Sequence, residues 1–148
     1  MLRAPLRRGE MSDTDPAREF METLPHARAL GLRLVQMGAG RAEIEMDYDT
    51  RLIGDPETGV IHGGAVSALM DTCCGAAAMS HPASPGGTAT IDLRIDYMRP
   101  ATPGQTIRAQ AECYHVTRSV AFVRARATDD DTARPVAAAT GSFTVEGG

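Results

Sequence analysis

Residues 62–79 read HGGAVSALMDTCCGAAAM, and this stretch decides how the chain folds. It has the length and the apolar composition of a buried helix that begins at two glycines. Asp71 is its one charged residue, and it is also the only Asp, Glu, Lys or Arg between Glu57 and Asp92. A carboxylate in a buried helix is costly unless it is paired or used. Asp71 is therefore the first residue to examine for chemistry.

Outside this helix the sequence predicts mainly strands. Apolar and polar residues alternate over 41–48, 89–97, 107–113 and 120–128, which is the pattern of strands with one buried and one solvated face. Two more strands are expected over 32–37 and 135–145, a short helix over 16–29, and a loop rich in turn-forming residues over 49–61. A long helix that is apolar nearly all round must be enclosed. We therefore expect an α+β fold in which about six antiparallel strands form a curved sheet wrapped around the helix.

Composition limits the function. The chain has 148 residues, a net charge of −4 and fifteen basic residues that are all arginine. Without lysine, Schiff-base and P-loop chemistry are excluded, and the net negative charge is not typical of nucleic-acid binding. The apolar helix is too short to span a membrane. We expect one cytoplasmic domain over residues 16–148, after a disordered basic arm over 1–15, with translation starting at Met1 or Met11.

The three cysteines do not form a disulfide framework or a metal site. Cys73 and Cys74 are adjacent, which is not a metal-ligand spacing, and no histidine lies within four residues of them. No general base stands at an obvious spacing for a thiol nucleophile. We expect reduced cysteines that pack as small apolar residues, and a protein without metal or redox cofactor.

Gly63 and Gly64 lie where a loop meets the predicted helix. The first N–H groups of a helix have no partner within it, and the helix dipole adds partial positive charge there. Such an end can polarise a carbonyl group or stabilise an oxyanion, with His62 ordering the loop or donating a bond of its own. The alternative is a capped helix whose glycines serve packing.

The spacing of these groups predicts a second copy of the chain. Asp71 lies seven residues after Gly64, about 10 Å along a helix that rises roughly 1.5 Å per residue. A nucleophile and an oxyanion donor both need to lie about 3 Å from the reacting atoms, so one helix does not easily supply both. Two antiparallel helices related by a two-fold axis can, which predicts a homodimer with two equivalent sites. The alternative is a structural Asp71, paired with an arginine or with backbone amides.

Other hydroxyl groups are weaker candidates. Ser67 and Thr72 lie on the helix, where such residues usually bond back to the helix backbone. Thr90 shares the polar face of its strand with Asp92 and Arg94, and from there its side chain could reach a site at the interface.

Three features together resemble one known family. They are His62-Gly63-Gly64, Asp71 nine residues after the histidine, and the sequence TIDLRIDYMRP over 90–100. This combination resembles the PaaI-like branch of the hotdog-fold acyl-CoA thioesterases, from about residue 28 to 145. The resemblance implies the hotdog fold, a homodimer and often a homotetramer that is a dimer of dimers.

The resemblance also implies a reaction, the hydrolysis of an acyl-CoA to a carboxylic acid and free CoA. By this resemblance Asp71 is the nucleophile or the general base, and the amide of Gly64 or Gly63 polarises the thioester carbonyl. His62 is expected to order the loop, and Thr90 to help place the water. Alternative functions are a hotdog dehydratase, an acyl-carrier-protein thioesterase or a non-catalytic acyl-CoA-binding module.

Substrate contacts are less well defined. Many relatives carry Asn in the loop before the HGG sequence, where this chain has Asp55 or Pro56, so Asp55 is a candidate substrate-binding residue. The phosphates of CoA would need arginines near the mouth of the site. Arg99, Arg118 and Arg124 are the candidates.

Overall fold

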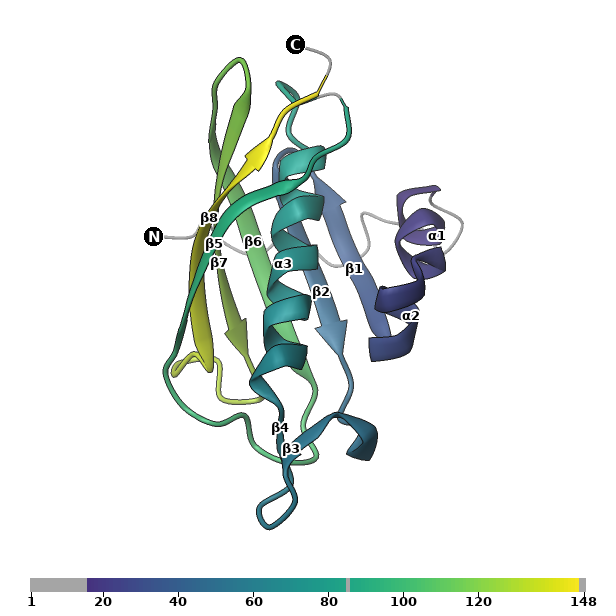
Figure 1. The fold of residues 1–148 in the computed structure, drawn as a ribbon, viewed down its shortest axis with the longest axis vertical. Coiled ribbons are helices and arrows are strands. Elements are labelled where there is room, and N and C mark those ends of the chain that lie inside the picture. Colours follow the sequence, from purple (N-terminus) through teal and green to yellow (C-terminus); the bar gives the residue numbers. More distant parts are fainter. Residues whose placement is uncertain (1–15, 85, 147–148) are drawn as a thin grey trace.

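The computed structural model describes residues 16–84 and 86–146 (Figure 1). The basic arm predicted over 1–15 lies outside these residues. The helical elements are α1 (Pro16–Thr23), α2 (Pro25–Leu30), the 3-10 turn η1 (Thr50–Leu52) and α3 (Gly63–Met79). The strands are β1 (Leu32–Gly38), β2 (Arg41–Met46), β3 (Ile53–Asp55), β4 (Val60–Ile61), β5 (Thr90–Tyr97), β6 (Ile107–Val116), β7 (Val120–Thr128) and β8 (Ala137–Thr144).

One antiparallel sheet and one long helix make up most of the described chain. The sheet has six strands in the order β1-β2-β6-β7-β8-β5. Figure 1 shows the sheet curving behind α3, with α1 and α2 beside β1. The predicted α+β architecture is confirmed, and α3 ends at Met79 as expected.

The core lies between α3 and the sheet. Leu69, Met70 and Cys73 on the inner side of α3 are fully buried. They belong to one apolar cluster with Ile44 of β2 and Val123 of β7. Burial of a large aliphatic side chain contributes about 1.5–3 kcal/mol, so this contact is a main source of the stability that holds α3 in place. Within the described residues, no helix combines the length and apolarity needed to cross a membrane.

Two local predictions were wrong. The single helix expected over 16–29 is broken into α1 and α2, because Pro25 has no N–H for a continuing helix and instead begins α2. The loop expected over 49–61 contains η1 and a small hairpin of β3 and β4. This hairpin leads directly into the start of α3, so it positions the HGG segment.

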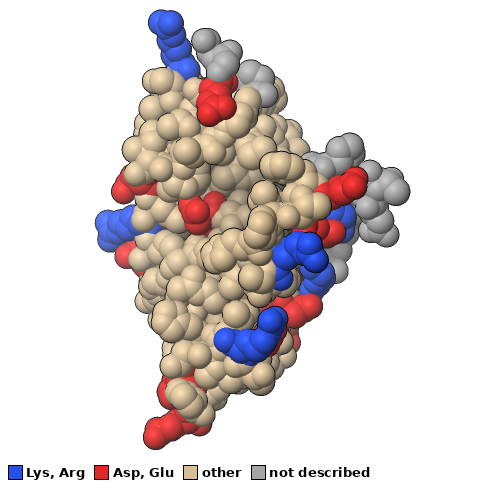
Figure 2. All heavy atoms as spheres, turned by 45° about the vertical axis from the view of Figure 1, so that its right-hand side comes forward, with Lys and Arg blue, Asp and Glu red and all other residues tan. Residues whose placement is uncertain are grey.

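The apolar side of β5 is only partly covered. Strict alternation assigns Ile91 and Tyr97 to a buried face, yet they are 55% and 51% exposed. β5 is the last strand of the sheet and pairs with β8 alone among the described strands. The outer side of α3, which carries Ala68, Asp71 and Gly75, is also only partly buried. Uncharged side chains cover most of the face seen in Figure 2.

Candidate active site

His62 orders the start of α3. Its backbone is extended, and its Nδ1 atom accepts a hydrogen bond of 2.8 Å from the Gly64 N–H. The His62 N–H donates to the carbonyl of Leu52 over 2.8 Å, and the His62 carbonyl accepts from the Ala65 N–H over 3.0 Å. An Nδ1 acceptor requires the neutral imidazole ring. His62 thus caps the helix and links it to η1.

Gly63 presents the N–H group that this cap leaves open. Within the described residues the Gly63 N–H has no hydrogen-bond partner, and the residue is exposed. The Gly63 carbonyl accepts from the Tyr97 hydroxyl over 2.9 Å and from the Ser67 hydroxyl over 3.1 Å. The hydroxyls of Ser67 and Tyr97 also contact each other. The first turn of α3 therefore has a firmly held carbonyl and an available amide.

Asp71 has one polar partner in the described part of the chain. Its Oδ1 atom accepts a hydrogen bond of 2.7 Å from the Thr90 hydroxyl. The register of β5 against β8 shifts between Thr90 and Asp92, which explains how Thr90 faces α3 although strict alternation groups it with Asp92 and Arg94. No arginine or backbone N–H among the described residues contacts this carboxylate, which is partly exposed. One of its oxygens is therefore free to accept a proton or to attack.

Separate hollows border the two ends of this region. The Gly63 hollow, about 430 Å³, lies between Gly63, Val66, Tyr97 and the segment after β5. A second hollow, about 320 Å³, touches His62 and Gly64 on the side of α2 and η1. Asp71 and Thr90 line a third, about 220 Å³, whose opposite wall is formed by α1. In one chain the carboxylate and the helix start thus open into different cavities.

The cysteines on α3 are packing residues. Cys73 and Cys74 are fully buried. Burial, together with a smaller contribution from the nearby charge of Asp71, raises the pKa of the Cys74 thiol to about 12. Burial also raises the pKa of Cys73 well above its ordinary value. Both thiols are protonated at neutral pH, which disfavours a thiolate nucleophile.

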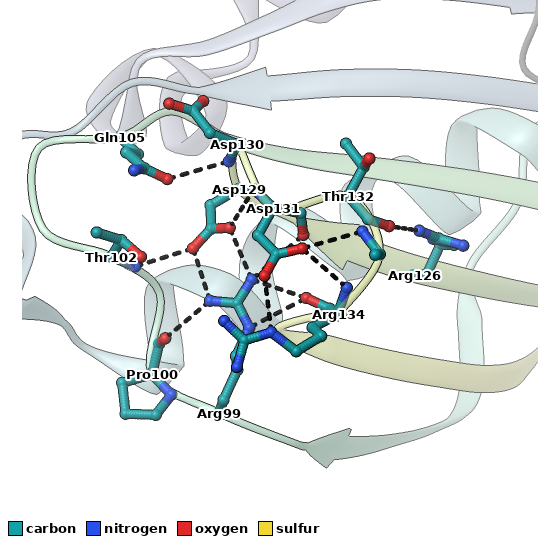
Figure 3. Close-up of polar contacts among 11 residues, drawn as sticks. Arg99, Pro100, Thr102, Gln105, Arg126, Asp129, Asp130, Asp131, Thr132 and Arg134 are labelled. Carbon is teal, nitrogen blue, oxygen red and sulfur yellow. Dashed lines mark hydrogen bonds and ion pairs between the residues drawn. The ribbon is translucent and has the colours of Figure 1, made fainter.

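Arg99 forms a polar cluster that joins two loops (Figure 3). Its guanidinium donates to both carboxylate oxygens of Asp129, over 2.7 and 2.6 Å, and to the carbonyls of Pro100 and Arg134. Asp129 also accepts from the N–H groups of Thr102 and Asp131. The Arg99 guanidinium holds the pKa of the Asp129 carboxyl well below its usual range. Arg99 borders the Gly63 hollow, but its donors are engaged within the chain.

None of the other predicted substrate contacts lines the Gly63 hollow. Arg118 is exposed in the turn between β6 and β7, and the Arg124 guanidinium lies 4.7 Å from the ring centre of Tyr114. Asp55 closes the β3–β4 turn, where it accepts from the Glu57 N–H and the Thr58 hydroxyl. Their roles in binding CoA stay predictions. Among the described residues, no group of three or more His, Cys, Asp or Glu side chains is placed to hold a metal.

Sequence reasoning did not find the contact of Tyr97 with Gly63. The residue was assigned to the apolar face of its strand, and its hydroxyl gave no separate signal. The wall that Phe20 and Met21 of α1, with Leu24 after it, contribute beside Asp71 was also missed. Both contacts join residues distant in sequence.

Comparisons with known proteins identify relatives of the chain. Residues 58–136 match the family described as "Thioesterase superfamily". A solved structure from Pseudomonas aeruginosa is 41% identical, with a TM-score of 0.76, and the match covers 86% of this chain and 95% of that chain.

Several relatives carry functional names, of which two are described here. The medium/long-chain acyl-CoA thioesterase YigI of Salmonella typhimurium is 25% identical over 139 residues, covering 85% of this chain and 88% of the relative. The acyl-coenzyme A thioesterase PaaI of Escherichia coli is 29% identical over 91 residues, covering 60% of each protein. The solved structure of PaaI aligns with a TM-score of 0.78 at 24% identity, over 89% of this chain and 91% of that chain.

Proposed function

The chain belongs to the thioesterase superfamily and has its hotdog fold, and from this premise we propose that it hydrolyses an acyl-CoA to a carboxylic acid and free CoA. One observation carries the proposal. Among the described residues, the Gly63 N–H has no hydrogen-bond partner, and the Asp71 carboxylate on the same helix accepts one bond, from Thr90. A base or nucleophile and an oxyanion donor are the two groups that acyl transfer needs.

Asp71 supplies the base or the nucleophile. As a general base, it takes a proton from a water that attacks the thioester carbonyl carbon. As a nucleophile, it forms an acyl anhydride that water then cleaves. In both routes the C–S bond breaks and the CoA sulfur leaves as a thiolate that takes up a proton. The Thr90 hydroxyl donates to Oδ1, and in both routes Oδ2 is the oxygen that meets the water or the substrate.

The start of α3 supplies the oxyanion donor. Gly63 is favoured over Gly64 for this role, because the Gly64 N–H already donates to His62. The Gly63 N–H also lies at the positive end of the helix dipole, which stabilises the oxygen as negative charge develops. Loss of one such donor typically costs about 3 kcal/mol of transition-state stabilisation. His62 contributes by keeping the first turn in place.

Two copies of the chain complete each site. Three features support this: the different hollows that border Asp71 and Gly63, the unpaired outer edge of β5 among the described strands, and the exposed Ile91 and Tyr97. Pairing two such chains about a two-fold axis covers the exposed apolar side chains. It brings Asp71 of one subunit toward Gly63 of its partner. A dimer of dimers is part of the same proposal.

The acyl chain occupies the Gly63 hollow. Val66, Ala101 and Val136 give this hollow apolar walls, and its volume of about 430 Å³ lies within the usual range for small-molecule sites. CoA extends outward from it, and Arg118 and Asp55, which do not line this hollow, keep their predicted roles as contacts of CoA. Arg99 is the weaker phosphate candidate, because binding a phosphate would compete with its bonds to Asp129.

The test is free-thiol release from a panel of acyl-CoA substrates by the wild type and by Asp71→Asn. We expect turnover to fall by about three orders of magnitude or more, because the amide is neither a base nor a nucleophile. The exposed Asp130, which lies outside α3 and β5, gives a matched control, Asp130→Asn, which should keep wild-type turnover.

Three results would contradict the proposal. Near-wild-type hydrolysis by Asp71→Asn would exclude the mechanism. Binding of CoA esters by calorimetry without thiol release by the wild type would indicate a binding module. Dehydration of a 3-hydroxyacyl thioester without hydrolysis would indicate a dehydratase.

A further inference from the structure

The peptide group between Gly63 and Gly64 is held at both ends by side chains. On its N–H side, Gly64 donates to His62 Nδ1 over 2.8 Å. On its carbonyl side, Gly63 accepts from the Tyr97 hydroxyl over 2.9 Å and from the Ser67 hydroxyl over 3.1 Å. His62 and Ser67 lie close in sequence, whereas Tyr97 comes from β5, 34 residues away.

This restraint acts where the backbone is least constrained. Glycine populates a wider range of backbone angles than any other residue, so two successive glycines permit the peptide group between them to rotate. The Gly63 N–H, which is the donor proposed for the oxyanion, belongs to the preceding peptide group. The two torsion angles of Gly63 set its direction relative to the Gly63 carbonyl, so holding this carbonyl narrows the directions in which the N–H can point. A catalytic donor needs to be held within about 0.5 Å and 10–20° of its productive geometry. Local sequence alone does not provide this precision.

We propose that Tyr97 is a positioning residue that holds the Gly63–Gly64 peptide and thereby aims the Gly63 N–H at the thioester oxygen. The inference rests on the proposed function. Two interactions of Tyr97 contribute. Its hydroxyl donates to the Gly63 carbonyl, and its ring edge lies 3.5 Å from the point where a Gly63 Cβ would sit, so the ring packs against the glycine. Ser67 supports the same carbonyl from within α3.

The hydroxyl and the ring of Tyr97 have separable roles. Tyr97→Phe removes the donor but retains the ring that packs on Gly63. The exposed Tyr114 on β6 provides the matched control, Tyr114→Phe, because its hydroxyl makes no hydrogen bond to a described residue. Ser67→Ala removes the second donor to the same carbonyl. Because both hydroxyls act on one oxygen, their effects should not be additive.

The experiment measures kcat and KM for one acyl-CoA that the wild type hydrolyses, together with the backbone amide resonances of Gly63 and Gly64. Tyr97→Phe should lower kcat about tenfold, the loss expected for one hydrogen bond, and leave KM within about twofold. The Gly63 and Gly64 resonances should shift, whereas Tyr114→Phe should change neither readout. Ser67→Ala should have a smaller effect on kcat, and the double variant should lose less than the product of the two.

Several outcomes would overturn the inference. A wild-type kcat in Tyr97→Phe, or unchanged glycine amide resonances, would show that the hydroxyl does not position the donor. A rise in KM with unchanged kcat would place Tyr97 in substrate binding instead. These failures are distinct from failure of the proposed function, in which the wild type itself would release no thiol from any acyl-CoA.

Discussion

Two aspartates in this chain have opposite environments. Asp129 has a fully buried side chain and accepts two bonds from Arg99 and further bonds from the N–H groups of Thr102 and Asp131. Asp71 is partly exposed and accepts one bond, from the Thr90 hydroxyl, within the described residues. The cluster around Asp129 is complete within one chain, whereas the region around Asp71 is not.

The difference separates structural from chemical carboxylates. A carboxylate whose lone pairs are all engaged by donors is stabilised in its charged form and does not take part in proton transfer. A carboxylate with an oxygen that no donor reaches keeps lone pairs available for a proton or for a carbonyl carbon, as a general base or a nucleophile requires. The same residue type thus serves two purposes, according to the number of donors that reach it.

The largest effect that bears on this comparison is a loss of turnover, and it tests whether a partner completes the Asp71 region. Gly63→Pro removes the N–H of the proposed oxyanion donor. Proline fits the first position of a helix, and the extended backbone of His62 suits the residue before proline. We expect a fall in kcat of about 10²–10³-fold in this variant. A mixed dimer of Gly63→Pro and Asp71→Asn subunits should recover activity, because one of its two sites combines an intact Asp71 with an intact Gly63.

Thiol release by mixed dimers, isolated through two different affinity tags, measures this recovery. The expected value is about half of the wild-type rate per dimer, since one of two equivalent sites is restored. Homodimers of each variant, purified in the same way, are the controls. Mixed dimers as inactive as both parents would mean that the carboxylate and the amide act within one chain.

The next effect tests whether the Asp129 cluster is structural. Asp129→Asn leaves the Arg99 guanidinium, which is 17% exposed, without its charged partner. We expect a loss of about 3 kcal/mol in the free energy of unfolding, measured by urea titration, because breaking a buried ion pair strands a charge. Turnover per folded molecule should stay within about threefold of wild type. Asp71→Asn is the counterpart and should leave the urea midpoint nearly unchanged. A large loss of stability in Asp71→Asn, together with wild-type stability in Asp129→Asn, would refute the comparison.

The smallest effect is the pH dependence of this stability. The pKa of Asp129 lies below its ordinary value of 3.8, so the folded state binds its proton less readily than the unfolded state. The contribution of Asp129 is therefore fully present above about pH 5 and decreases as the pH falls below about 4. Urea titrations of wild type and Asp129→Asn should differ by a constant amount from pH 8 to 5 and converge at lower pH. A difference that grows on acidification would contradict the assignment.

Much of the fold follows from periodicity. The alternation over 107–113 and 120–128 predicted strands that are present as β6 and β7, and the apolar composition of 63–79 predicted α3. Periodicity failed where one residue interrupts a pattern, as Pro25 does between α1 and α2. It also failed at β5, because alternation shows that one face is apolar but not whether the same chain covers it.

For the candidate site, the sequence indicated the residues but not the contacts that they make. The choice of Asp71, His62, Gly63 and Gly64 came from composition, spacing and a family resemblance, which are local in sequence. The hydrogen-bond partners of these residues could not be predicted from local sequence. The contact of Thr90 with Asp71 and that of Tyr97 with Gly63 join residues 19 and 34 positions apart. The ion pair of Arg99 with Asp129 joins residues 30 positions apart, and the sequence did not predict it for the same reason.

Residue order was enough to predict one long apolar helix, the alternating strands and an unusual carboxylate, because side-chain period and hydrophobicity act over a few residues. Tertiary structure decided which carboxylate is saturated, which glycine amide stays available and which side of β5 stays exposed. These properties depend on donors and surfaces that folding brings together from distant segments, and the energy of a buried polar group is set by those neighbours.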